Sequence, residues 1–492
     1  MAKERPKGVA ETITKRGDTG YYPKTRESGV KWLGEIPSHW EVMRLGNAAE
    51  VMMSNVDKST VQGEVPVRLC NYVDVYKNER VTDQLDFMNA TATTDEIKKF
   101  HLDRNDVLLT KDSEEWDDIG IPSLVQYTAP DLICGYHLAI LRPYTGLVTG
   151  PYLLRVLQSR NVALQFHVQA NGVTRYGLTF NGIKNIRIPI PPKPEQDAIA
   201  QYLDYLDSRL ELLRRSYRRL MSLIDEQKQV IIQDTVIHGV ARETGTKRSE
   251  VTWIDDIPSN WVERRAKFFL REIDERSTDG KEELLSVSHI TGVSPRSQKS
   301  VYMFKASSYV GHKLCQPGDL VINTMWAWMG AMGIAKQAGL VSPSYAVYRL
   351  WRKDDFVPDF LDYLLRTLPF RAEFMRRSTG IRPSRLRLYP DKFLQIPLIQ
   401  PPGEEQEQIT NLIRMRTQEL DSAIASVRRE IALISEYRTK LISDVATGKL
   451  DIRGRIPEQA NESDNHGVPE PGRDEGFDTP ETVMDVEHNA DE

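Results

Sequence analysis

One motif occurs twice in this chain of 492 residues, and the repetition limits what the chain can fold into. The stretch WLGEIPSHWEV begins at Trp32, and WIDDIPSNWVE begins 221 residues later at Trp253. Other landmarks follow in the same order: NDVLLT and GDLVIN, NGVTRYGL and TGIRPSRL, IPIPPKPEQ and IPLIQPPGEEQ. An order of landmarks kept over about 200 residues indicates that a whole structural unit is duplicated.

Each copy has the same organisation. Short β-type runs, Gly/Pro/Asn turns and one or two helices come first and indicate a mixed α/β domain. A double proline follows, and from Glu195 and Glu404 neither proline nor glycine occurs until Gly239 and Gly448. Apolar residues in these two stretches recur in alternating steps of four and three, which is a heptad pattern. The expected fold class is α+β: two similar mixed α/β domains separated by an antiparallel pair of long coiled-coil helices, with a pseudo-twofold repeat.

The landmarks and the charge distribution divide the chain into six segments. They are an N-terminal extension (1–28), a first domain (29–193), a central helix (194–240), a second domain (251–402), a distal helix (403–449) and a tail (455–492). The tail carries twelve acids and two bases, so the remaining residues have a net charge of +5. A tail with so few large apolar residues is predicted to be disordered.

Several protein classes are excluded or disfavoured. No apolar run is long enough to span a membrane, and the N-terminus has no secretory signal pattern. The three cysteines are far apart in the sequence, which fits a reducing cytoplasm and argues against a zinc module. We find no GxxxxGK[ST], HExxH, GxSxG or GxGxxG motif, so we expect no catalytic residues, no metal site and no cofactor bound by this chain.

Basic residues are the positive signal for function. The segment Phe370–Phe393 is a turn that contains glycine and proline, and its candidate DNA-binding residues are Arg376, Arg377, Arg382, Ser384, Arg385 and Arg387. The same slot of the first copy holds Arg175, Tyr176 and Lys184. Arginines on such a turn can reach phosphates and the edge of guanine, although a solvated basic loop is the alternative. The loops after NDVLLT and GDLVIN differ, which indicates that the two domains read different sequences.

A second basic group lies on the predicted central helix. Arg214, Arg215, Arg218 and Arg219 form like-charged pairs at i,i+4, which destabilise an isolated helix slightly. Either this face is simply solvated, or it docks a phosphate or an acidic partner surface.

The doubled arrangement resembles the specificity subunit of a type I restriction–modification system over residues 29 to 450. The residues that carry it are IPIPPKPEQ and IPLIQPPGEEQ, the two heptad helices and the VATGKLD ending at Asp451. The resemblance implies that each domain recognises one half of a bipartite, asymmetric double-stranded DNA target. The helices would set the spacer and dock two methyltransferase subunits. Those partners would bring S-adenosylmethionine, and separate restriction/translocase subunits would use ATP and Mg²⁺, while this chain would have no catalysis of its own.

Two other classes remain open. One is an enzyme, a fused methyltransferase or nuclease, although the chain lacks a cofactor loop and an NPPY- or DPPY-like tetrapeptide. The other is a coiled-coil scaffold that binds other proteins through its two heads. Salt-dependent binding of duplex DNA would distinguish the scaffold from a specificity subunit.

Overall fold

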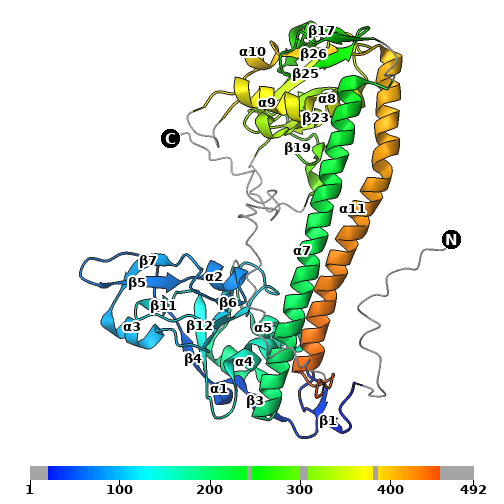
Figure 1. Ribbon diagram of the computed structural model, residues 1–492. Helices are drawn as coiled ribbons and strands as arrows, with labels where there is room; N and C mark the ends of the chain where they lie inside the picture. The colour runs from blue at the N-terminus through cyan, green and yellow to red at the C-terminus, as the bar shows by residue number, and fades with distance from the viewer. Residues whose placement is uncertain (1–19, 174, 241–244, 300–307, 381–385, 455–492) are drawn as a thin grey trace, which may run out of the picture. The chain divides into compact units, whose positions relative to one another are not determined.

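The computed structural model of the chain describes residues 20–173, 175–240, 245–299, 308–380 and 386–454 (Figure 1). The described residues form two compact units. Unit 1 takes the residues up to Tyr217 and those from Arg429 onward, and unit 2 takes Arg218–Arg428. Residues 1–19 of the predicted extension and the predicted acidic tail lie outside the described residues.

The centre of unit 1 is a five-stranded sheet. Its strands lie in the order β4 (Ala49–Met53), β12 (Leu138–Pro143), β8 (Val107–Thr110), β10 (Pro122–Val125) and β6 (Arg80–Val81). Neighbouring strands are antiparallel except β10 and β6, which are parallel. Every residue of β8 and β10 is buried, as expected for apolar runs such as VLLT that do not alternate with polar residues.

Smaller sheets and six short helices complete unit 1. The sheets are β1 (Thr25–Glu27) with β2 (Glu35–Pro37), β3 (Glu41–Arg44) with β14 (Arg187–Ile190), β9 (Asp112–Ser113) with β13 (Tyr176–Gly177), and β11 (Leu132–Cys134), β5 (Val65–Cys70) and β7 (Met88–Ala92) in that order. The helices are α1 (Leu45–Ala48), α2 (Tyr72–Lys77), α3 (Thr94–Phe100), α4 (Gly150–Gln158), α5 (Arg160–Gln169) and α6 (Phe180–Asn185).

Unit 2 has a four-stranded antiparallel sheet at its centre. Its strands lie in the order β18 (Leu270–Ile273), β25 (Ala346–Leu350), β22 (Leu320–Ile322) and β23 (Met332–Ile334). Two-stranded pairs are β15 (Thr246–Arg248) with β16 (Asp256–Pro258), β17 (Val262–Arg265) with β26 (Pro397–Gln400), β19 (Leu285–Ser288) with β20 (Gly292–Pro295), and β21 (Lys313–Cys315) with β24 (Gly339–Val341). The short α-helices are α8 (Pro358–Leu365), α9 (Leu368–Arg377) and α10 (Pro390–Phe393), and the 3-10 turns are η2 (Ala266–Phe268), η3 (Arg296–Gln298) and η4 (Ala327–Met329).

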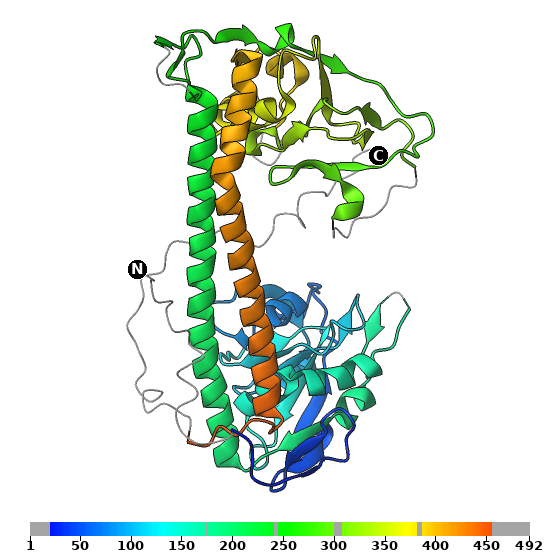
Figure 2. The same cartoon turned by 90° about the vertical axis from the view of Figure 1, so that its right-hand side faces the viewer.

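Two long helices are present, as predicted: α7 (Lys193–His238, 46 residues) and α11 (Gly403–Ala446, 44 residues) (Figure 2). Each contributes to both units. In unit 1 the start of α7 packs antiparallel against the end of α11, and in unit 2 the end of α7 packs against the start of α11. The predicted seam is less buried in the middle of α7, where Leu213 and Leu220 are 36% and 43% exposed. Two helices alone cover a seam less completely than helices that also contact a domain.

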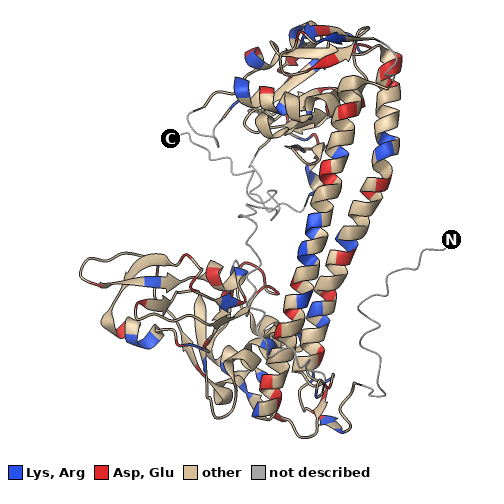
Figure 3. Cartoon of the chain, in the orientation of Figure 1, with Lys and Arg blue, Asp and Glu red and all other residues tan. Residues whose placement is uncertain are grey.

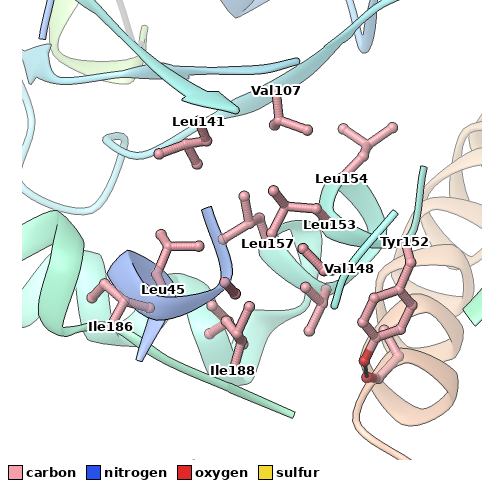
Figure 4. Packing of buried hydrophobic residues seen from close by; sticks show 14 of the residues in the cluster. Leu45, Val107, Leu141, Val148, Tyr152, Leu153, Leu154, Leu157, Ile186 and Ile188 are labelled. Carbon is pink, nitrogen blue, oxygen red and sulfur yellow. Dashed lines mark hydrogen bonds between the residues drawn. The ribbon is translucent and has the colours of Figure 1, made fainter. Parts of the chain in front are cut away.

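Helix α4 carries much of the apolar core of unit 1 (Figure 4). Its residues Leu153 and Leu157 lie in the same cluster as Leu141 of the central sheet. The hydroxyl of Tyr152 lies 2.8 Å from the carbonyl oxygen of Pro189 and 3.2 Å from that of Ala446. Since Ala446 is the last residue of α11, this hydroxyl reaches a carbonyl that has no partner within the helix.

A glutamine at the start of each long helix holds the neighbouring α/β domain. The buried side chain of Gln196 accepts a hydrogen bond from the backbone N–H of Thr149 at 2.9 Å. The buried side chain of Gln406 accepts one from the backbone N–H of Val357 at 2.7 Å. Both glutamines also donate to a carbonyl of the double-proline segment. Thr149 and Val357 immediately precede α4 and α8, so each glutamine satisfies a backbone N–H at a helix start.

The glutamate before each glutamine binds near the IPSxW motif, which is Ile36–Trp40 in unit 1 and Ile257–Trp261 in unit 2. Glu195 accepts a hydrogen bond of 2.6 Å from the hydroxyl of Tyr22 and lies 2.9 Å from Nε2 of His39. Glu405 accepts a hydrogen bond of 3.0 Å from the indole Nε1 of Trp261. The start of each long helix is thus tied to the motif of its own unit.

The IPSxW motif also receives the glycine that follows a long helix. Gly448 follows α11 with φ +74°, and a Cβ there would lie 2.7 Å from Cγ of Pro37 and 3.0 Å from Cζ3 of Trp40. Gly239 follows α7 with φ +74°, and a Cβ there would lie 3.1 Å from Cζ2 of Trp261. The motif of unit 1 therefore holds the end of α11, and the motif of unit 2 holds the end of α7.

Buried charges add a second connection within unit 1. The guanidinium of Arg155 in α4, which is 1% exposed, lies 2.6 Å from Asp204 and 2.7 Å from Asp207, both in α7. Arg438 of α11 pairs with Asp207 at 2.8 Å and with Glu79. Arg155 is the fully buried member of this group, so removing its acids would leave a buried charge without its partners, which is destabilising.

We predict that Gly448→Ala destabilises unit 1. A left-handed alanine with its Cβ pressed on Pro37 and Trp40 should lower the free energy of unfolding by about 2–5 kcal/mol. Gly454→Ala is the matched control, because Gly454 has φ +75° and no atom within 4 Å of its Cβ position. The control should cost only about 1–2 kcal/mol of backbone strain. Urea unfolding of both variants measures the difference, and equal losses would show that the motif does not confine Gly448.

Candidate nucleic-acid interface

A hairpin lies beside the central sheet of unit 1. The backbones of Asn171 and Gly177 exchange two hydrogen bonds of 3.1 and 2.9 Å, which close it. The next residue, Leu178, donates its N–H to the carbonyl of Lys111 at 2.8 Å. Because Lys111 directly follows β8, the hairpin is fixed at the end of a buried strand.

Unit 2 makes the same backbone bonds. Thr379 and Arg387 exchange two hydrogen bonds of 3.0 and 2.9 Å. Leu388 donates its N–H to the carbonyl of Thr324 at 2.8 Å, just beyond β22. Three predicted DNA-binding residues of this segment, Arg382, Ser384 and Arg385, lie outside the described residues. Arg387 is described, and its guanidinium lies 6.0 Å from the ring centroid of Tyr389.

The predicted residues of unit 1 occupy two different elements. Arg175 is exposed on the hairpin, and Tyr176 is the first residue of β13, which pairs with β9. Lys184 is in α6, where its half-buried side chain lies against Gly46 and its Nζ is 5.0 Å from the ring of Phe180. The hairpin therefore brings Arg175 and Tyr176 together, whereas Lys184 belongs to a helix that packs on α1.

An aromatic group that the sequence analysis did not nominate lies near Arg175. It consists of Tyr72, Tyr76, Tyr136 and His137. The rings of Tyr72 and Tyr76 stack at 5.4 Å, and those of Tyr136 and His137 meet at 4.7 Å. The ammonium of Lys111 lies 4.4 Å from the ring of Tyr136. Burial raises the pKa of Tyr72, and the charge of Arg175 acts in the opposite direction.

This aromatic group is suited to nucleic acid, because exposed aromatic rings with cations beside them stack on bases and attract phosphates. Tyr76 and Tyr136 are 41% and 48% exposed. The hydroxyl of Tyr76 donates to Asp118 at 2.7 Å, and this bond with burial raises the pKa of Tyr76 to about 12. The only local signal in the sequence was the i,i+4 spacing of Tyr72 and Tyr76, since the other members are more than 30 residues away in the chain.

The loop after β9 makes unit 1 different from unit 2. Glu114, Trp116 and Asp117 are exposed there, and the ring of Trp116 lies edge-on to His167 at 6.1 Å. In unit 2 the corresponding loop carries Trp326 and Trp328, whose rings stack at 5.8 Å and are half-buried. Carboxylates accept hydrogen bonds from cytosine, whereas indole rings cannot, so the two loops differ in the contacts that they can make.

Two of the predicted arginines in unit 2 are already paired. Arg376 donates to Glu373 at 2.6 Å, and Arg377 donates to the same carboxylate. Burial alone would raise the pKa of Glu373, but the two arginines hold this pKa below its ordinary value. A third arginine of the same helix, Arg371, also belongs to the predicted basic segment Phe370–Phe393, and its buried Nε has no hydrogen-bond partner among the described residues.

The four candidate docking arginines lie along the middle of α7 (Figure 3). Arg214 and Arg215 lie 3.4 and 3.5 Å from Glu211 of the preceding turn. Arg215, Arg218 and Arg219 are exposed, whereas Arg214 is half-buried. Exposed apolar side chains share this helix, among them Leu212, Leu223 and Val230. At about 100° per residue the three fall within a narrow stripe on one face.

Within the described ranges, no three His, Cys, Asp or Glu side chains form a group that could hold a metal ion. None of the described helices is both long and apolar enough to cross a membrane.

Comparisons with known proteins show what this chain is similar to. Residues 37–220 match the family model described as the type I restriction modification DNA specificity domain. The chain is 21% identical over 439 residues to the putative type I restriction enzyme MjaX specificity subunit of Methanocaldococcus jannaschii, covering 86% of this chain and 96% of the relative. The resemblance to type I specificity subunits is confirmed. Specificity subunits are the non-catalytic DNA-recognition subunits of type I systems.

Two further matches agree with this family. The MjaVIII specificity subunit of the same organism is 22% identical over 437 residues, with 85% of this chain and 94% of that subunit covered. A solved structure titled as the basis of complex assembly and conformational transition of the type I R-M system aligns with a TM-score of 0.56 and 16% identity. The alignment covers 84% of this chain and 99% of that one, which shows a shared fold.

Proposed function

We propose that this chain is the DNA sequence-specificity subunit of a type I restriction–modification complex, and that it reads a bipartite, asymmetric duplex target. The observation that carries the proposal is that both units make the same set of backbone bonds beyond a central strand and surround them with different side chains. Asn171 and Gly177 in unit 1 correspond to Thr379 and Arg387 in unit 2. One scaffold used twice with different contact residues is what recognition of two unlike half-sites requires.

In unit 1 the hairpin arginine and the aromatic group would form the DNA surface. The guanidinium of Arg175 offers a planar fork of hydrogen-bond donors. The ammonium of Lys111, which lies against the ring of Tyr136, adds a second positive charge. In unit 2 the corresponding surface would include the paired residues Thr379 and Arg387 and the turn that carries Trp326 and Trp328. These residues would divide into base contacts that specify sequence and phosphate contacts that position the duplex.

The long helices would serve the partners. The exposed pair Arg218 and Arg219 recurs as Arg428 and Arg429 on α11, 210 residues later. Glu195 and Glu405 have the same offset, so the two arginine pairs occupy equivalent positions of the duplicated helices. Two equivalent basic patches, with Arg214 and Arg215 beside the first, suit two copies of one methyltransferase subunit with an acidic surface.

The remaining partners would bring the chemistry. In this proposal S-adenosylmethionine binds to the methyltransferase subunits, and ATP and Mg²⁺ bind to restriction/translocase subunits, all in the cytoplasm. This chain would supply recognition and architecture alone.

We predict that Arg175→Ala weakens binding of the full-length chain to duplex DNA without lowering its melting temperature. Loss of a base contact should cost about 1–3 kcal/mol, and loss of a phosphate contact should lower affinity for all sequences. Arg160→Ala is the matched control, because Arg160 is an exposed arginine of the same unit at the first residue of α5. A filter-binding titration with a random-sequence duplex pool measures both. If the unmodified chain retains no duplex, the proposed function is wrong and the scaffold interpretation gains support.

We predict that reversing Arg218 and Arg219 to glutamate reduces the complex from two methyltransferase subunits to one. Reversing Arg428 and Arg429 as well should remove both, since like charges would then meet at each patch. The control is reversal of Arg264 and Arg265, an exposed pair on β17 of unit 2. Native mass spectrometry of the co-purified complex counts the subunits. A complex that keeps both subunits in the fourfold variant would exclude docking through these arginines.

We predict that lengthening both long helices lengthens the DNA spacer. Asp207 and Arg438 face each other across the helix pair. A heptad inserted after Leu213, six residues beyond Asp207, therefore has its counterpart directly before Ala432, six residues before Arg438. Seven residues add ~10 Å of helix and keep the heptad phase. That length matches roughly three base pairs at 3.4 Å each. Methylation mapping with the partner subunits should show unchanged half-sites and a longer spacer, and an unchanged spacer would mean that the helices do not set it.

A further inference from the structure

Arg371 occupies a distinctive place in unit 2. It lies in α9, and its Cδ is 3.3 Å from the position that a Cβ on Gly330 would take. Gly330 has φ +87° and ends the turn that carries Trp326 and Trp328. A side chain at that turn would meet the arginine stem, so glycine leaves the space in which Arg371 packs.

The described part of the chain gives Arg371 no counter-charge. Its buried Nε has no hydrogen-bond partner there. The nearby carboxylate on the same helix, Glu373, is bound by Arg376 and Arg377 instead. Burial, together with the like charge of Arg366, lowers the pKa of Arg371. An unsatisfied buried donor on a charged group is destabilising, so the fold carries this arginine at a cost in stability.

Packing does not require an arginine at this position. Ser159 and Thr367 precede α5 and α9, and both donate their hydroxyl to the carbonyl three residues earlier. Ser159 and Thr367 are 208 residues apart in the sequence. The same offset aligns Phe166 with Phe374, and both rings are fully buried. It places Ala163 of unit 1 where unit 2 has Arg371. One scaffold thus folds with alanine or with arginine at this site.

We propose that Arg371 is a DNA-contacting residue of unit 2, whose guanidinium fork binds a pair of acceptor oxygens or an oxygen–nitrogen pair on the half-site that this unit reads. The inference rests on the proposed function. Two acceptors on DNA have this chemistry: the phosphate oxygens and the O6/N7 edge of guanine. Either would supply a partner for the guanidinium, whose buried Nε has none among the described residues.

The test compares Arg371→Ala and Arg371→Lys with Arg264→Ala in the full-length chain. Arg264 is an exposed arginine of the same unit, so its loss changes the net charge equally. The probe is a pool of duplexes of about 40 base pairs with random sequence. It is titrated at several salt concentrations, and the bound duplexes are sequenced after selection. Arg371→Ala should bind on the order of tenfold more weakly than Arg264→Ala, with an unchanged or higher melting temperature. Arg371→Lys keeps the charge and the stem, so it reports on DNA contact even if the alanine variant folds poorly.

The outcomes separate the two acceptors. A phosphate contact predicts weaker binding to every sequence, a salt slope smaller by about 1, and substantial rescue by lysine. A guanine contact predicts loss of preference at one base pair of one half-site, and little rescue by lysine because lysine lacks the fork. Equal affinities of the Arg371 and Arg264 variants would overturn the inference while leaving the proposed function intact. Failure of the unmodified chain to bind the pool would overturn both.

Discussion

The contact between a helix-end glycine and a buried tryptophan is the constraint on which the rest of the structure depends. In unit 1 that glycine is Gly448 and the tryptophan is Trp40, about 400 residues apart in the sequence. Because Gly448 follows the end of α11, the core of unit 1 is complete only when α11 has packed into it. Gly239 and Trp261 make the corresponding contact in unit 2. As a result, each long helix ends in the unit in which the other long helix begins.

Some arginine side chains form ion pairs within the described part of the protein, and others have no partner there and can bind a ligand. Arg155 and Arg438 are bound by the acids of α7 and Glu79, so their charges are compensated within unit 1. Arg376 and Arg377 share Glu373 in the same way. Arg371 differs, because its Nε finds no partner among the described residues. An uncompensated cation on a scaffold that also accepts alanine is better explained by binding than by stability.

In the proposed function, one fold would serve two recognition tasks. The same backbone bonds lie beyond a central strand in both units. The side chains around them are free to differ, since they contribute little to the core. An aromatic group with Lys111 marks unit 1, and a pair of indole rings with Arg371 marks unit 2. If the proposed function holds, divergence confined to such a surface changes the DNA sequence that is read and leaves the contacts with the long helices unchanged.

The sequence by itself determined the presence of the two long helices, because proline, glycine and heptad spacing act locally. It also contained the i,i+3 and i,i+4 spacing that binds Arg376 and Arg377 to Glu373. Only the tertiary structure decided the strand order, the partners of Gln196 and Gln406, and the neighbours of Arg175. Those contacts join residues distant in the chain, and their energies depend on burial and on a competing partner, neither of which a local pattern records.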